Sequence, residues 1–198
     1  MKILCVGRNY VDHAKEMNSP VPEQPLLFIK PASSLAEQLE KMPIPTFTDN
    51  LHYEAEWVLR LGKDCINPDE NNAYSFIDAM TVGIDLTARD IQSQLKKKGH
   101  PWEIAKSWDG AAIVGDFIPF STPVTFDLSI NNKIVQKGNS QDMIFSITDI
   151  IIYASQFFTL QKGDLIFTGT PEGVGPIHSG DVLEANLNGQ QLLLASFQ

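Results

Sequence analysis

The feature that most constrains the fold is an apolar stretch at 51–62 that carries two glutamates. Its sequence, LHYEAEWVLRLG, is rich in Tyr, Trp, Val and Leu, which predicts a β-strand ending at Gly62. Because side chains alternate between the two faces of a strand, Glu54 and Glu56 are expected to point the same way, and Trp57 the other way. The pair indicates either the solvated face of an edge strand or a divalent metal site. A third oxygen ligand elsewhere would favour the metal site.

Composition and charge restrict the class of protein. Of 198 residues, 43% are hydrophobic and 20% are charged, which predicts a single domain over 1–198 with a substantial core. The 24 acidic and 15 basic residues give a formal net charge of −9. Nucleic acids and anionic membranes require a basic surface, so we expect neither as a partner. The net charge does not exclude small anionic substrates, because their binding depends on the local charge of a pocket.

The cysteines and the N-terminus predict a cytoplasmic location. Cys5 and Cys65 form no CxxC motif, which argues against a disulfide framework or a structural zinc site. The apolar run after Met1 is too short for the core of a signal peptide. No apolar stretch has the length of a membrane span.

Apolar runs between prolines and glycines predict most of the secondary structure. Strands are expected at 3–6, 26–29, 76–86, 111–114, 117–120, 124–130 and 165–167. Hairpin turns are expected at Asn131-Asn132 and, within 181–198, at Asn188-Gly189. Helices are expected at 8–17, 67–75, 87–95 (with Thr87 as N-cap) and 144–158, and a loop with a short helix at 32–50.

Two residues of the first predicted helix could form an acid–base pair. His13 and Glu16 are three positions apart and therefore share a helix face. A carboxylate beside an imidazole orients it and raises its pKa, as a general acid or base requires. The alternative is a surface pair worth a few tenths of a kcal/mol. From these two residues alone, the surface pair is favoured.

Further polar residues lie near predicted strand and helix ends. Asp85 ends the strand at 76–86, and an aspartate in such an apolar run is costly unless it is paired or coordinating. Arg89 and Gln92 share one face of the following helix, and Lys106 stands alone between apolar residues. The basic run at 96–98 is expected to be a solvated helix end.

A glycine-rich turn at 168–175 follows the last predicted core strand. Its backbone N–H groups and the Thr170 hydroxyl could bind an anion. The turn lacks the GKS or GKT ending of a P-loop. By itself it is more simply a tight turn.

Together, six motifs in order along nearly the whole chain resemble the fumarylacetoacetate hydrolase (FAH) superfamily. They are Gly7-Arg8-Asn9-Tyr10 with His13, Phe28-Ile29-Lys30-Pro31, Glu54-Ala55-Glu56, Asp85-Leu86-Thr87-Ala88-Arg89-Asp90-Ile91-Gln92, Ala105-Lys106-Ser107-Trp108-Asp109 and Thr168-Gly169-Thr170-Pro171-Glu172-Gly173-Val174-Gly175. The chain is most similar to the short single-domain branch, which includes acylpyruvate hydrolases, oxaloacetate decarboxylases and tautomerases, and 2-hydroxyhepta-2,4-diene-1,7-dioate isomerases.

The resemblance implies an α+β fold, mainly β: a mixed β-roll with short flanking helices and an N-terminal lid helix, in a homodimer. It also implies roles for the residues at matching positions. These are Mg²⁺ or Mn²⁺ ligands (Glu54, Glu56, Asp85), a catalytic dyad with a lysine beside the metal (His13, Glu16, Lys106) and substrate contacts (Arg89, Gln92, Thr170). An all-oxygen ligand set suits a hard cation better than zinc.

Two departures from the family pattern concern the substrate. Trp57 follows Glu56 where the family usually has a smaller aliphatic residue, and Ser107-Trp108 replaces a commoner Gly-Phe type pair. Both are expected to reshape the pocket wall. His52 shares the strand parity of the glutamates but is expected to be a bystander.

The implied activity is a Mg²⁺-dependent reaction of a short 2-oxo or 2,4-dioxo acid through a metal-stabilised enolate. Acylpyruvate hydrolysis and oxaloacetate decarboxylation or tautomerisation are the leading alternatives, because they share this intermediate. The next alternative is a 2-hydroxyhepta-2,4-diene-1,7-dioate isomerase or decarboxylase of aromatic catabolism. A hypothesis from another class is a non-catalytic module that binds a metal or a 2-oxo acid.

Overall fold

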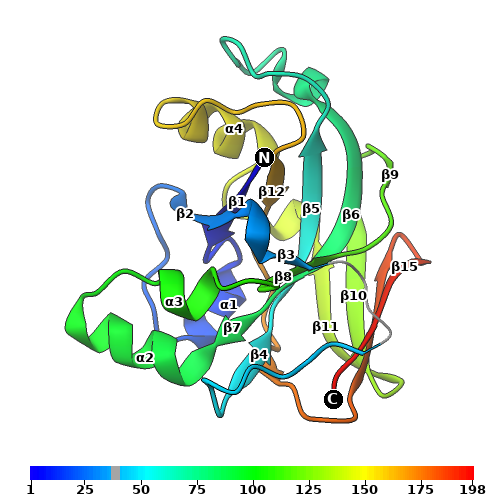
Figure 1. Ribbon diagram of the computed structural model, residues 1–198. Coiled ribbons are helices and arrows are strands. Elements are labelled where there is room, and N and C mark those ends of the chain that lie inside the picture. The colour runs from blue at the N-terminus through cyan, green and yellow to red at the C-terminus, as the bar shows by residue number, and fades with distance from the viewer. Residues whose placement is uncertain (37–40) are drawn as a thin grey trace.

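The protein, for which we have a computed structural model describing residues 1–36 and 41–198, is built from three β-sheets with short helices beside them (Figure 1). The largest sheet follows the order β2 (Leu26–Pro31), β1 (Lys2–Gly7), β12 (Leu165–Phe167), β5 (Ala55–Leu61), β6 (Ile77–Asp85), β8 (Ala112–Val114) and β3 (Leu35–Ala36), with β9 (Ile118–Pro119) paired to β6. The β1–β12 and β3–β8 pairs are parallel and the others antiparallel. The predicted mixed, mainly β fold is confirmed.

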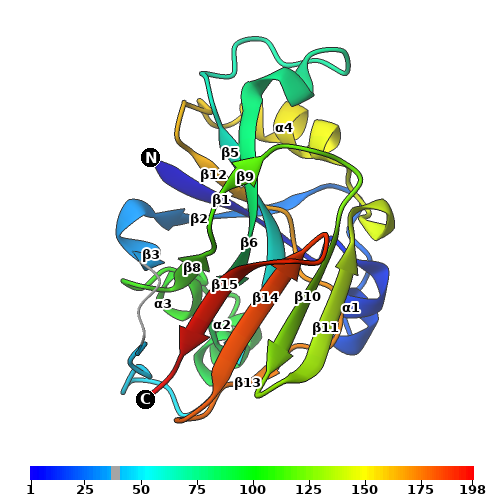
Figure 2. The same ribbon diagram turned by 90° about the vertical axis from the view of Figure 1, so that its right-hand side faces the viewer.

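The second sheet is an antiparallel layer of two hairpins (Figure 2). Its order is β11 (Lys133–Asn139), β10 (Thr125–Ile130), β14 (Val182–Leu187) and β15 (Gln190–Ser196). Asn131 and Asn132 have φ of 51° and 65°, and Asn188 and Gly189 have φ of 51° and 78°. Two-residue hairpin turns of this kind need positive φ at both central positions, which Asn and Gly adopt readily. Both predicted turns are confirmed.

The main core lies between these two sheets. Trp57 and Leu59 of β5 pack in the same buried cluster as Leu128 of β10 and Leu183 of β14. Trp57 is fully buried, and its ring stacks on Phe120 with centroids 6.2 Å apart. By strand alternation, Glu56 lies on the opposite face of β5. The prediction that Trp57 reshapes the pocket wall is therefore wrong, since this ring belongs to the core.

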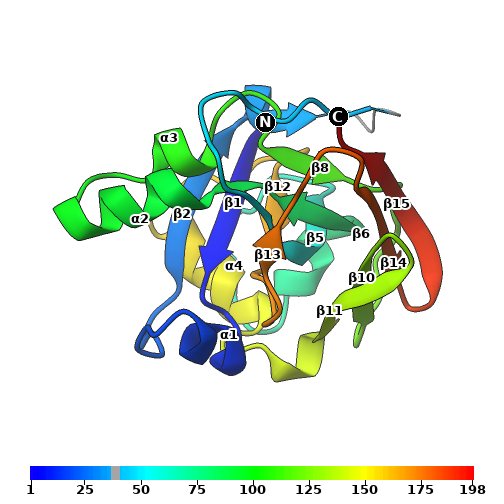
Figure 3. The ribbon, with the colours of Figure 1, turned by 90° about the horizontal axis from the view of Figure 1, so that it is seen from below.

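The described part of the chain forms four α-helices beside the sheets: α1 (Val11–Glu16), α2 (Arg89–Lys98), α3 (Glu103–Lys106) and α4 (Ile147–Ser155). Seen from below, α1 and the α2–α3 pair lie as separate groups beside β1 and β2 (Figure 3). A capping box fixes the start of α4, in which Ser146 and Asp149 each bond the other's backbone N–H. Within the described residues, none of these helices has both the length and the apolar character that crossing a membrane requires.

The long strand predicted at 51–62 is divided in two. β4 (Leu51–Tyr53) joins a third sheet with β13 (Gly175–Pro176) and β7 (Thr87–Ala88), whereas β5 belongs to the largest sheet. The chain changes sheets at Glu54. The Ala55 N–H bonds the side chain of Gln136 instead of a neighbouring strand, at 2.9 Å.

All four predicted helices differ from the structure, and those at 8–17 and 144–158 differ only in being shorter, as α1 and α4. The segment at 67–75 forms turns and a 3₁₀ turn (Ala73–Phe76), because Asn67 has a left-handed φ of 48° and Asp69 bonds the N–H groups of Asn71 and Asn72. The helix predicted at 87–95 begins at Arg89 and reaches Lys98. The predicted loop at 32–50 contains a 3₁₀ turn (Ala32–Ser34) and β3, and residues 37–40 lie outside the described residues.

Candidate active site

Three buried carboxylates meet where β5 and β6 pair. Glu54 lies at the β4–β5 junction, Glu56 in β5 and Asp85 at the end of β6. The register places Ala55 opposite Ile84, and the Asp85 N–H donates to the Glu54 carbonyl at 2.8 Å. One oxygen atom of each carboxylate lies within 4.8 Å of the others. The strand pairing thus brings together the three side chains predicted as metal ligands.

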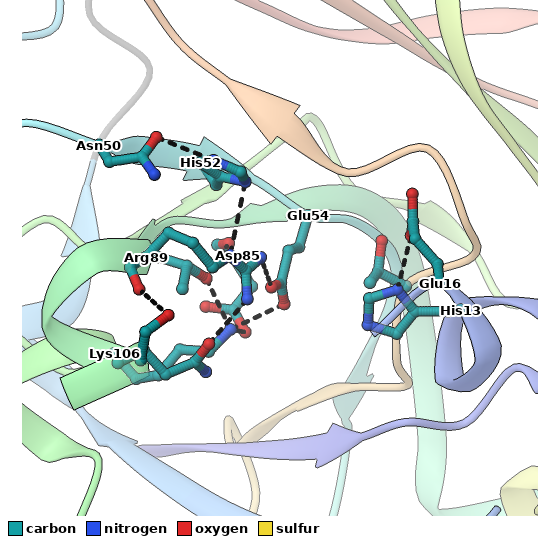
Figure 4. Close-up of polar contacts among 12 residues, drawn as sticks. His13, Glu16, Asn50, His52, Glu54, Asp85, Arg89 and Lys106 are labelled. Atoms are coloured by element: carbon teal, nitrogen blue, oxygen red, sulfur yellow. Dashed lines mark hydrogen bonds and ion pairs between the residues drawn. The ribbon is translucent and has the colours of Figure 1, made fainter. Parts of the chain in front are cut away.

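Two cations neutralise part of this cluster (Figure 4). The Lys106 ammonium lies 2.7 Å from Glu54 Oε2 and 2.8 Å from Asp85 Oδ2, and it donates to the Thr87 hydroxyl at 2.7 Å. Arg89 donates to Glu54 Oε1 at 2.5 Å. The predicted N-cap role of Thr87 is wrong, because its hydroxyl faces Lys106 and the residue before α2 is Ala88.

A third cation, Lys30, was not predicted to have a role. Its fully buried ammonium lies 2.8 Å from Asp85 Oδ1 and donates to the backbone carbonyls of Lys106 and Ala111. A lysine is rarely buried unless it is paired. Its position at the end of an apolar strand in the Phe-Ile-Lys-Pro motif was the available signal.

Glu56 differs electrostatically from the other two carboxylates. Burial and the charges of Asp85 and Glu54 raise the pKa of Glu56 well above its usual value, although the Gly169 N–H donates to it at 2.6 Å. Burial also acts to raise the pKa of Glu54, but Lys106 and Arg89 outweigh it and lower that pKa. Among the described residues Glu56 has no cation partner. Three hard oxygen donors, one without a counter-charge, fit a divalent cation.

His13 and Glu16 lie across the pocket from Lys106 and Arg89, on the other side of Glu54 (Figure 4). His13 Nδ1 lies 3.2 Å from Glu16 Oε2, and the imidazole is largely buried. Burial lowers the pKa of His13, against opposing contributions from Glu54 and Glu16. A neutral imidazole whose Nδ1–H donates to Glu16 keeps a basic Nε2.

The glycine-rich turn directs its N–H groups at the protein's own carboxylates. Gly169 donates to Glu56, and Gly173 donates to Glu16 Oε1 at 3.1 Å. Gly169 has φ of +104°, and a Cβ there would lie 2.6 Å from the Cβ of Asn9, so only glycine fits. The turn therefore connects the acidic cluster with α1.

The predicted substrate contacts lie on two sides of the site. Arg89 donates to the Gln92 side chain at 2.7 Å, and the Thr170 hydroxyl accepts from Gln136 at 2.8 Å. His52, expected to be a bystander, contacts the site: its Nδ1 accepts from Arg89 Nε at 3.4 Å, and its Nε2 lies 2.9 Å from the Asn50 side chain.

One pocket is lined by eight of the nine predicted site residues. The ninth, Glu16, reaches the site through His13. The pocket is also lined by residues that were not predicted, among them Arg8, Lys96 and Trp102. Lys96 was expected at a solvated helix end; it is half-buried, whereas Lys97 and Lys98 are exposed.

The curled sheets and this acidic, cation-lined pocket define an enzyme of the fumarylacetoacetate hydrolase family. The family model described as "Fumarylacetoacetate (FAA) hydrolase C-terminal" matches residues 2–195, and the chain belongs to this family.

Curated relatives of the chain are oxaloacetate tautomerases. A mitochondrial one from Bos taurus is 41% identical over 192 residues, covering 94% of this chain and 87% of that protein. One from Escherichia coli (strain K12) is 41% identical over 197 residues, covering 96% and 90%. Among solved structures, fumarylpyruvate hydrolase from Pseudomonas aeruginosa in complex with Mn²⁺ and pyruvate superposes with a TM-score of 0.93 at 34% identity, covering 100% of this chain and 89% of that one.

Proposed function

We propose that the protein is a divalent-metal-dependent tautomerase of oxaloacetate, within a wider capacity for short 2-oxo acids. The observation that carries the proposal is that His13 lines the same pocket as the buried carboxylates of Glu54, Glu56 and Asp85. The oxaloacetate tautomerases that are 41% identical over nearly the whole chain support it.

Glu54, Glu56 and Asp85 would hold the metal, for which we propose Mg²⁺ or Mn²⁺. When bound, the metal supplies Lewis-acid stabilisation of negative charge on a substrate oxygen. Lys106 and Arg89 add positive charge at the same end of the pocket, which favours an anionic substrate. Gln92 and Thr170 would orient it through hydrogen bonds.

His13 is the group that moves the proton. Its Nε2 removes a proton from C3 of the keto acid, the electrons of the C–H bond form the C2–C3 double bond, and the π electrons of the carbonyl move to the C2 oxygen. That oxygen then takes the proton from the His13 imidazolium, which gives the enol and returns His13 to its neutral form. The reverse sequence returns the keto form. Glu16 accepts the Nδ1–H bond, which orients the ring and stabilises the imidazolium.

The test follows the ultraviolet absorbance of enol-oxaloacetate as it converts to the keto form. Acceleration is expected with Mg²⁺ or Mn²⁺ and not with chelator. Pyruvate formation in the same samples measures decarboxylation separately. A folded, metal-loaded protein that leaves the tautomerisation rate unchanged would exclude the proposal.

Acylpyruvate hydrolysis is a second candidate, supported by the likeness to fumarylpyruvate hydrolase. His13 Nε2 could take a proton from water instead of from carbon. A panel of oxaloacetate, acetylpyruvate and 2-hydroxyhepta-2,4-diene-1,7-dioate separates tautomerase, hydrolase and isomerase. Binding without turnover of any of them would favour the non-catalytic module.

We further propose that residues 1–198 act as one catalytic domain in a cytoplasmic homodimer. The free thiols of Cys5 and Cys65 fit a reducing compartment. Sedimentation equilibrium tests the assembly, and a monomer at all concentrations would contradict it.

A further inference from the structure

Two cations of the pocket are not used by the acidic cluster. Arg8 and Lys96 both line it, one from the turn after β1 and the other from the C-terminal half of α2. Lys106 and Arg89 are committed to carboxylates. Within residues 1–36 and 41–198, neither Arg8 nor Lys96 has a carboxylate partner.

Lys96 is held by an aromatic ring. Its ammonium lies 5.2 Å from the ring centroid of Trp102, which packs edge-on against Phe28 with centroids 6.3 Å apart. A cation–π contact orients an ammonium without neutralising it. Burial, and to a smaller extent the charges of Arg89 and Arg8, lower the pKa of Lys96 to about 8. The Lys96 ammonium thus shares the pocket with the guanidinium groups of Arg89 and Arg8.

Arg8 occupies a strained backbone conformation. Its φ is 58°, in the left-handed region that non-glycine residues rarely adopt. The next residue fixes this turn: the fully buried Asn9 side chain donates to the carbonyls of Phe145 and Thr168 and accepts the Phe145 N–H at 2.7 Å. Such strain persists where the surroundings impose it and is common at ligand sites.

The charge of the pocket contrasts with that of the whole chain. Four cationic side chains (Arg8, Arg89, Lys96, Lys106) and three carboxylates (Glu54, Glu56, Asp85) line it, so four minus three leaves +1. The chain as a whole has a formal charge of −9. The lining of the pocket is therefore net positive by formal charge, whereas the chain as a whole is net negative.

We propose that Arg8 and Lys96 form a second anion subsite, which binds the distal carboxylate of a 2-oxo dicarboxylic acid. The inference deepens the proposed function and rests on it for the position of the 2-oxo acid end, at the acidic cluster. The subsite makes the enzyme select diacids over monoacids of the same length.

The test compares two ligands that differ only at the distal end: oxaloacetate and 2-oxobutanoate, in which a methyl group replaces the carboxylate. Their dissociation constants are measured by calorimetry with Mg²⁺-loaded wild-type protein and the variants Lys96→Gln, Arg8→Gln and Lys97→Gln. Lys97 is the matched control, because it is an exposed cation on the same helix.

Lys96→Gln and Arg8→Gln are each expected to weaken oxaloacetate binding about ten-fold or more, the usual worth of a charge-assisted hydrogen bond. Binding of 2-oxobutanoate should change less than about two-fold, since it makes no contact with the subsite. Lys97→Gln should change neither ligand. Circular dichroism verifies that each variant is folded; should Arg8→Gln not fold, Lys96→Gln decides.

Equal weakening of both ligands, or no weakening of oxaloacetate, overturns the subsite. Failure of the proposed function is distinguishable from this. If the wild type discriminates the two ligands through Arg8 and Lys96 but does not accelerate tautomerisation, the subsite is supported and the proposed function is wrong. If the wild type and both variants tautomerise oxaloacetate with the same kcat/KM, the proposed function is supported and the subsite is wrong.

Discussion

The Nδ1 atom of His13 lies 3.2 Å from Oε2 of Glu16, and the same carboxylate accepts the Gly173 N–H through its other oxygen. Glu16 thus joins the imidazole to the glycine-rich turn that also donates to Glu56. The proposed base and one proposed metal ligand are both held by this turn.

Replacing His13 is expected to remove proton transfer and leave metal binding intact. His13→Gln should lower kcat for tautomerisation by about 10²–10⁴-fold, the usual contribution of a positioned acid–base group. Thermal stabilisation by Mg²⁺ should be unchanged, because His13 is not in the carboxylate cluster. Lys15→Gln on the same helix is the control, since that side chain is exposed and pairs with Asp12. Full activity of His13→Gln would contradict the role.

The pH profile should reflect the lowered pKa of His13. A base acts in its neutral form, so activity should be present above this pKa and lost as pH falls through it. Because burial lowers the pKa of His13 below its usual 6.5, the acidic limb of kcat/KM should lie below that pH. Glu16 raises the same pKa, and Glu16→Gln should therefore move the limb to lower pH. A limb above 6.5, or a shift upward in the variant, would rule out this assignment.

Glu56→Gln is expected to separate folding from metal binding. The substitution removes a buried charge that burial, Asp85 and Glu54 disfavour, so the melting temperature in chelator should equal or exceed that of the wild type. Mg²⁺ at 100 times its Kd should add about 2.7 kcal/mol to the wild type, or roughly 5–10 °C. The variant should show neither this stabilisation nor turnover. Wild-type stabilisation by Mg²⁺ in the variant would exclude Glu56 as a ligand.

Asp164 is expected to stabilise the fold in a pH-dependent way. Burial raises its pKa, but hydrogen bonds from Lys2 and from the Gln161 N–H outweigh this and hold the pKa below its usual value. Its contribution should be present above the unfolded pKa of about 3.9 and lost as pH falls through the folded value. Asp164→Asn should cost about 1–3 kcal/mol in urea unfolding at neutral pH and less in acid. Asp109→Asn, at an exposed position, is the control.

The sequence correctly predicted those turns and strands whose conformation depends mainly on neighbouring residues. The Asn131-Asn132 and Asn188-Gly189 turns follow from backbone preferences of those residues, and β6 follows from its apolar run. The helix predicted at 67–75 failed for the same kind of reason: Asp69 bonds nearby N–H groups and competes with the helix.

The sequence motifs predicted the nine candidate site residues, but they did not predict the contacts that support those residues. Nothing local to Lys30 indicates that its ammonium meets Asp85, because β2 and β6 are separated by three strands in the sheet. Lys96 resembles its neighbours Lys97 and Lys98 in sequence, and the structure distinguishes it by its burial, its place in the pocket and its contact with Trp102. The Lys30–Asp85 contact is long-range in sequence and therefore depends on the assembled fold.

Gln136 makes the clearest long-range contacts with the site, since it lies on β11 of the second sheet. Its buried side chain accepts the Ala55 N–H at 2.9 Å and donates to the Thr170 hydroxyl at 2.8 Å and the Pro171 carbonyl at 2.9 Å. It thus fixes the backbone between Glu54 and Glu56 and one proposed substrate contact. Because Gln136 is not among the residues that line the pocket, we expect it to act as a positioning residue.

Gln136→Leu should leave these buried groups unpaired and cost about 1–3 kcal/mol of stability. A purely structural role would end there. Positioning predicts in addition a weaker Mg²⁺ affinity in calorimetry and a higher KM for oxaloacetate, because Ala55 and Thr170 lose their shared support. Gln141→Leu, at an exposed position shortly after β11, is the matched control. Lower stability with unchanged Mg²⁺ affinity and KM would show that Gln136 supports the fold alone.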